Sequence, residues 1–136
     1  MVSAGVIGGI AGGRARRGFT LIELLVVMSI IALLLAIAVP RYMGRLQGAK
    51  ETALRQTLSV TREALDKFYA DTGKYPDDLA ALVTAKYLRS LPVDPITDST
   101  TTWVIVPAED ADKGVVYDLH SGAEGKGRDG TPFKEW

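Results

Sequence analysis

The sequence LIELLVVMSIIALLLAIAV, residues 21–39, is an unbroken apolar run with a single charged residue, Glu23. At about 1.5 Å of helical rise per residue, a run of this length extends over roughly the 30 Å of a bilayer's hydrocarbon core. Glu23 and Ser29 are its only polar side chains, whereas a surface helix of a soluble protein normally shows a whole polar face. The run therefore predicts a helix that is inserted in a membrane.

The composition limits what the rest of the chain can do. The 136 residues allow one modest domain beside this helix, and 16 basic residues balance 16 acidic ones, so no nucleic-acid partner is indicated. Without cysteine there is neither a disulfide nor a thiol nucleophile. His120 is the single histidine, and its neighbour Ser121 would point to the opposite face of a strand. These residues predict a protein that is not an enzyme.

Three interpretations of the apolar run compete. The first is a secretory signal, because AIA at residues 36–38 fits a small-x-small cleavage site and RRGF at residues 16–19 is similar to a twin-arginine signal. Residues 1–38 would then be a signal peptide on an exported soluble binding domain. The second is a plain single-pass anchor, which leaves Glu23 as an unexplained cost of about 2.5 kcal/mol. The third gives Glu23 a partner.

That third interpretation comes from a specific pattern. A basic stretch ends in Gly18, Phe19 follows, Glu23 comes four positions later, and Pro40 closes the apolar run. This pattern resembles the N-terminal region of type IV pilins and pseudopilins, whose signature the segment GFTLIELLVV matches almost letter for letter. The resemblance implies a leader over residues 1–18, which prepilin peptidase removes between Gly18 and Phe19. It also implies N-methylation of the new amino group of Phe19.

The same resemblance supplies a role for Glu23. In the family this carboxylate pairs with the amino terminus of a neighbouring subunit, which lowers the cost of a charge in lipid and sets the stagger between subunits. The implied partners are further copies in a helical filament, minor pseudopilins and an inner-membrane assembly platform. The implied location is the bacterial inner membrane, crossed once, with a cytoplasmic N-terminus and a periplasmic C-terminal domain. After assembly the filament would be periplasmic.

The expected fold is α+β and pilin-like, with a long N-terminal helix packed on a small antiparallel sheet. Residues 19–40 form the transmembrane and assembly helix, residues 41–73 its outer half, and residues 74–136 a small C-terminal αβ region. Four apolar residues at helical spacing predict packing against the protein's own sheet. They are Leu54, Leu58, Leu65 and Phe68.

The outer half of the helix contains residues that disturb or end helices. Pro40 removes one backbone donor, and Gly44 and Gly48 follow within two turns. Together they predict a kink or a loosened stretch between residues 36 and 48. Gly73 predicts the end of the helix, because glycine is the usual C-terminal cap.

The C-terminal part predicts short elements. After the helix, Asp77 is expected to cap a short helix over residues 78–83. WVIV at residues 103–106 and VVYDL at residues 115–119 predict two strands, joined by the polar loop 107–114. Trp136 is expected to dock on the domain, because an indole buries a large area.

Two phrases resemble the G-type major pseudopilin of type II secretion systems more specifically. They are DTGKYP at residues 71–76 and LPVDP at residues 91–95. The implied function is that of a structural subunit of a periplasmic pseudopilus that drives protein export by type II secretion. A subunit of a type IV pilus, used in adhesion, DNA uptake or motility, is the alternative.

The resemblance also points to a candidate calcium site. In G-type pseudopilins the last loop binds this ion, and residues 117–130 resemble a shortened form of that loop. The carboxylates available are Asp118, Glu124 and Asp129, whereas calcium normally takes six or more oxygen ligands. No cofactor is the main expectation, and calcium at these three residues is the alternative to an ordinary hydrogen-bonded loop.

Overall fold

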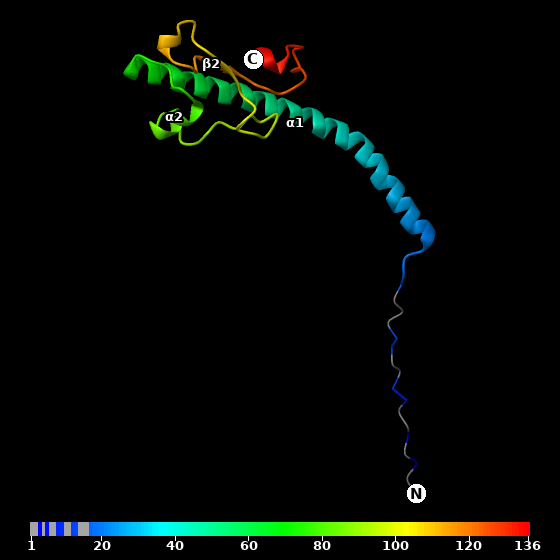
Figure 1. The fold of residues 1–136 in the computed structure, drawn as a ribbon. Helices are drawn as coiled ribbons and strands as arrows, with labels where there is room; N and C mark the ends of the chain where they lie inside the picture. The colour runs from blue at the N-terminus through cyan, green and yellow to red at the C-terminus, as the bar shows by residue number, and fades with distance from the viewer. Residues whose placement is uncertain (1–2, 4, 6–7, 10–11, 14–16) are drawn as a thin grey trace. The chain divides into compact units, whose positions relative to one another are not determined.

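The secondary structure follows the predicted α+β order. The computed structural model describes residues 3, 5, 8–9, 12–13 and 17–136, so Arg14 and Arg16 of the basic stretch lie outside the described residues. Within these residues a long helix comes first, and short elements follow it (Figure 1). In chain order they are α1 (Leu21–Thr72), α2 (Leu79–Thr84), β1 (Val104–Val106), the 3-10 helix η1 (Ala111–Lys113), β2 (Asp118–His120) and the 3-10 helix η2 (Phe133–Glu135).

The chain divides into two units between Val39 and Pro40. Helix α1 contributes to both, and its backbone is α-helical through Pro40, Gly44 and Gly48. The α-helix is therefore uninterrupted across residues 36–48. The kink predicted at these three residues stays a prediction.

The second unit has a core built on the apolar stripe of α1. Leu54, Leu58 and Leu65 are at most 2% exposed, as the sequence predicts. Phe68 packs against this core from its edge. Each fully buried leucine contributes about 2 kcal/mol through removal of apolar area from water. Figure 1 shows α2 and β2 flanking the last third of α1, and the core residues from outside α1 are Leu79, Leu82, Trp103, Val116, Leu119, Ala123 and Phe133.

Glycine ends α1 as predicted, but the cap of α2 differs from the prediction. Gly73 follows the last helical residue and has φ +76°, a conformation that glycine adopts without strain. The predicted cap of α2, Asp77, is wrong by one residue. Asp78 is the N-cap, because its backbone is extended and its side chain accepts a 2.8 Å hydrogen bond from the Ala81 N–H.

The sheet is a two-stranded antiparallel ladder within the described residues. Ile105 faces Leu119 in the register of β1 and β2. The second strand begins later than the sequence predicts, at Asp118. The reason is a different partner for the preceding residues, since the Val116 N–H donates to the Pro76 carbonyl at 3.0 Å. This segment therefore pairs with the chain that leaves α1.

A buried carboxylate fixes the connector between α2 and β1. Asp94, in the LPVDP phrase, is 0% exposed. Its Oδ1 accepts from the Ile96 N–H at 2.9 Å, and its Oδ2 accepts from the Ser121 hydroxyl at 2.5 Å. Ser121 in turn accepts from the Ala123 N–H. The connector is thus tied to the segment that follows β2.

Candidate functional site

The predicted cleavage site lies in an open, non-helical segment. Gly18 and Phe19 precede the first residue of α1, Leu21. A side chain at Gly18 would meet no other atom within 4 Å, and Phe19 is 84% exposed. A protease needs an extended and accessible backbone, and such segments are preferred sites of cleavage. The geometry therefore suits hydrolysis of the peptide bond between these two residues.

Glu23 lies in the first turn of α1. The Thr20 hydroxyl accepts a 3.2 Å hydrogen bond from the Glu23 backbone N–H, which makes Thr20 the N-cap. The spacing Thr20-x-x-Glu23 is that of a capping box, a signal that the sequence analysis missed. None of the ion pairs among the described residues includes Glu23. Its carboxylate is exposed and available to a cation from another molecule.

The apolar run of α1 is exposed in the part of the chain that the structure describes. Among the described residues, α1 is the one helix that is long and apolar enough to cross a membrane, and none of its apolar window is buried. Leu21 is 83% exposed and Leu33 is 66% exposed. A continuous apolar surface of this size is not stable in water. This surface therefore needs an apolar cover, which a lipid bilayer or another apolar protein surface can supply.

The three carboxylates considered for calcium do not converge. The Asp118 Oδ1 accepts from the Arg62 Nε at 2.8 Å, and the Asp129 Oδ2 accepts from the Arg55 Nη2 at 3.2 Å. Glu124 is exposed to solvent. Among the described residues, no group of three or more acidic, histidine or cysteine side chains could hold a metal ion. These three carboxylates therefore do not form a shared group of ligands, and calcium at these residues stays a prediction.

The surroundings of Asp129 favour its charged form. Its Oδ1 accepts from the Thr131 N–H at 2.9 Å. This hydrogen bond, assisted by the charge of Arg55, lowers the pKa of Asp129 below its usual value of 3.8. The aspartate is therefore negatively charged at neutral pH and pairs with the guanidinium.

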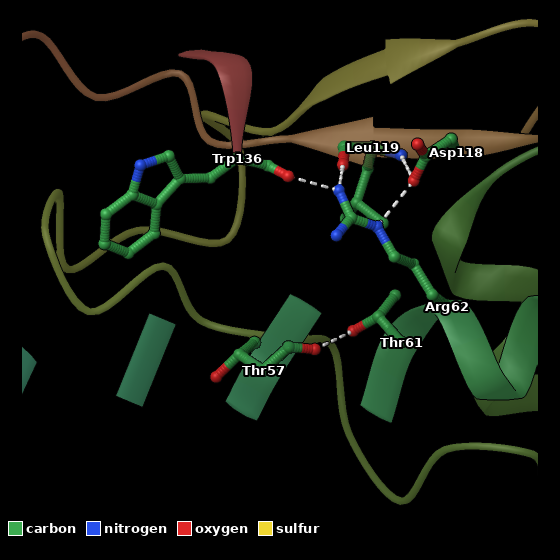
Figure 2. Close-up of polar contacts among 6 residues, drawn as sticks. All are labelled: Thr57, Thr61, Arg62, Asp118, Leu119 and Trp136. Carbon is green, nitrogen blue, oxygen red and sulfur yellow. Dashed lines mark hydrogen bonds and ion pairs between the residues drawn. The ribbon is translucent and has the colours of Figure 1, made fainter. Parts of the chain in front are cut away.

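Arg62, on α1, contacts the segment after β1, and the sequence pattern did not single it out. It donates to the Asp118 carboxylate and to the main-chain oxygens of Leu119 and Trp136 (Figure 2). A signal was present, because Arg62 lies four residues after Leu58 and three before Leu65, next to the buried stripe. Such a position brings a cation close to the packed domain.

Known proteins match the N-terminal pattern and, in longer alignments, more than half of this chain. Residues 13–39 match the family described as the prokaryotic N-terminal methylation motif. The type II secretion system core protein G of Pseudomonas aeruginosa is 37% identical over 98 residues, which cover 60% of this chain and 69% of that protein. The chain belongs to this family of pilin-like core G proteins. A core protein G from Klebsiella pneumoniae is 34% identical over 96 residues, covering 59% of this chain and 69% of that protein.

Pilus proteins are similar to this chain as well. The type IV wide pilus major component PilA4 of Thermus thermophilus is 33% identical over 81 residues, which cover 60% of this chain and 61% of that protein. No solved structure was found to match the chain. The matched names describe components of secretion systems and pili, and none describes an enzymatic activity. The motif and the apolar helix fit a membrane-anchored pseudopilin.

Proposed function

We propose that this chain is the structural subunit of a periplasmic pseudopilus that drives protein export by type II secretion. The observation that carries the proposal is the 37% identity to a core protein G over 69% of that protein's length. The exposed apolar helix supports it, because that helix requires lipid before assembly and neighbouring copies afterwards. Self-association into a filament follows from these two observations.

The first step is processing of the precursor. Prepilin peptidase would cut between Gly18 and Phe19, with the N-terminus in the cytoplasm and the C-terminal domain in the periplasm. The cut liberates an amino group on Phe19, which methylation keeps positively charged. The exposure of both residues supports this step.

The second step is assembly through a charge pair. The Glu23 carboxylate of one subunit accepts a hydrogen bond from, and pairs in charge with, the cationic amino group of Phe19 of its neighbour. A lone charge within the bilayer costs about 2.5–3.5 kcal/mol, and pairing removes much of that cost. The free energy of assembly is therefore most favourable when the two groups meet, and this requirement fixes the axial stagger between subunits. Minor pseudopilins and an inner-membrane platform would start and drive the polymer.

The decisive experiment identifies the mature N-terminus and the phenotype together. The precursor is expressed in its host, and the membrane form is analysed by N-terminal sequencing and mass spectrometry. An N-methylated Phe19, together with loss of exoprotein release when the gene is deleted, supports the proposal. A mature chain that begins at Val39 would instead support an exported soluble domain.

A type IV pilus is the second candidate function. The similarity to PilA4 of Thermus thermophilus and to the fimbrial protein EcpC of Eikenella corrodens favours it, the latter at 34% identity over 85 residues. Electron microscopy of the cell surface separates the two. Loss of surface filaments and of twitching, with normal exoprotein release, would favour the pilus.

A further inference from the structure

We propose that two arginines of α1, Arg55 and Arg62, hold the segment 118–136, called here the C-terminal loop, and take the role that the family resemblance gives to calcium. The loop would then be ordered without any metal. This inference concerns the stability of the folded subunit and goes beyond the function proposed above. It stands on contacts within the second unit alone, so it does not depend on secretion or filament growth.

Arg62 supplies the first and larger contact. Its Nε donates to the Asp118 Oδ1 at 2.8 Å, and its Nη2 donates to the Leu119 carbonyl at 3.1 Å and to the Trp136 main-chain oxygen at 2.5 Å. One guanidinium thus joins the first and last residues of the C-terminal loop. Figure 2 shows Arg62 between them, with the indole ring of Trp136 directed away.

The oxygens that Arg62 binds are of the kinds that calcium binds. They are one carboxylate and two main-chain oxygens, and calcium sites in proteins are made of the same groups. The guanidinium can replace an ion here because it is always charged and presents several donors in a rigid plane. Only 37% of the Arg62 side chain is exposed, so solvent weakens this contact less than a fully exposed ion pair.

Arg55 supplies the second contact, two helical turns earlier. Its Nη2 lies 3.2 Å from the Asp129 Oδ2, and its Cζ lies 4.3 Å from the centroid of the Trp136 ring. The Thr131 N–H binds the other oxygen of Asp129, so the turn and the ion pair support each other. Arg55 therefore holds the middle of the C-terminal loop and its terminal aromatic residue together.

Glu51 supplies the third contact, one turn before Arg55. Its Oε1 accepts from the Arg128 backbone N–H at 3.1 Å, and Glu51 is only 8% exposed. The Arg128 guanidinium lies on the bare backbone at Gly48, where a Cβ atom would come within 2.9 Å of its Cζ. The missing side chain at Gly48 thus leaves room for the Arg128 guanidinium to pack against the helix backbone.

The same contacts argue against a shared metal ion. Asp118 and Asp129 each bind a different arginine, and positions 55 and 62 are roughly 10 Å apart along a helix. A calcium ion needs its oxygens within about 2.6 Å, so it would have to break both pairs. It would also place a divalent cation beside guanidinium groups that are already positively charged.

Calcium addition to the purified full-length chain in detergent micelles gives the first test. Hydrogen exchange of the amides in the C-terminal loop and the thermal melting of near-ultraviolet tryptophan signals are measured in excess CaCl₂ and in excess EGTA. Trp103 and Trp136 both lie in the second unit, so the melt reports this unit. Identical protection and melting temperature in the two conditions are expected. Added protection or a higher melting temperature with CaCl₂ would overturn the proposal.

Arg62→Met gives the second test, because it keeps most of the aliphatic stem and removes the donors. The melting temperature should fall by about 4–8 °C, and protection should be lost at both ends of the C-terminal loop. Lys67→Met is the matched control, since Lys67 lies on the same helix in an exposed pair with Glu63. Equal effects of the two variants would show that Arg62 has no special role.

A charge exchange keeps the proposal testable if Arg62→Met does not fold. Arg55→Asp should reduce protection of residues 128–131, and Asp129→Arg added to it should restore part of that protection. Restoration supports a direct pair between these positions. If the double variant is no better protected than Arg55→Asp, the pairing at this position is wrong.

Discussion

Ser121 donates a 2.5 Å hydrogen bond from its hydroxyl to the Asp94 carboxylate, and both residues are completely buried. The two lie 27 positions apart in the chain. This contact joins the LPVDP connector to the segment after β2. It also gives the Ser121 hydroxyl a buried carboxylate as its partner.

Removal of the Ser121 hydroxyl should therefore destabilise the second unit. Ser121→Ala leaves a buried carboxylate oxygen without its donor, and such a loss costs about 1–3 kcal/mol. Urea unfolding of the purified chain, followed by tryptophan fluorescence, measures the change. Ser59→Ala is the control, because Ser59 is exposed on α1. A midpoint for Ser121→Ala equal to that of the control would show that the buried contact adds nothing.

The leucine stripe of α1 should dominate the stability of the same unit. Leu58 is 2% exposed, and Leu58→Ala should lower the free energy of unfolding by about 3 kcal/mol through lost burial and a cavity. Val60→Ala is the matched control on the open side of the helix, since Val60 is 43% exposed. Differential scanning calorimetry in detergent gives both values. Similar destabilisation by the two variants would contradict the position of the core.

The pair of Tyr87 and Asp71 should make alkaline stability dependent on pH. The Tyr87 hydroxyl donates to the Asp71 Oδ2 at 2.5 Å, and this hydrogen bond raises the pKa of Tyr87 above 10.0. A raised pKa in the folded state stabilises the fold fully below pH 10, and the gain is lost as pH rises through the raised pKa. NMR titration of the Tyr87 ring measures the pKa directly. Asp71→Asn should return it toward 10, and an unchanged value would contradict the bond.

Much of this fold follows from local patterns in the sequence. The apolar run, the stripe of Leu54, Leu58 and Leu65, and Gly73 each act through neighbours on one helix, so spacing alone identifies them. The exposed positions of Gly18 and Phe19 likewise follow from their place before the helix. These features need no knowledge of distant parts of the chain.

The remaining features depend on contacts between distant residues. The start of β2 is shifted because Val116 pairs with Pro76, 40 positions away along the sequence. The partners of Arg62 are 56 to 74 positions away, and no local pattern specifies them. Calcium at the three acidic residues is a prediction from the sequence alone. Only the three-dimensional contacts show that two of those residues are already paired with arginines.

The central claim is that the Glu23 carboxylate drives assembly by pairing with a neighbour's amino terminus. The most direct measurement compares Glu23→Gln with Ser29→Ala in cells, by electron microscopy of overproduced filaments and by exoprotein release. Ser29 is a polar residue in the same run, and its hydroxyl bonds the Leu25 carbonyl of its own helix. We predict that Glu23→Gln is processed and inserted normally but forms no filaments and releases no exoprotein, whereas Ser29→Ala assembles like the wild type. Wild-type filaments and release with Glu23→Gln would contradict the account.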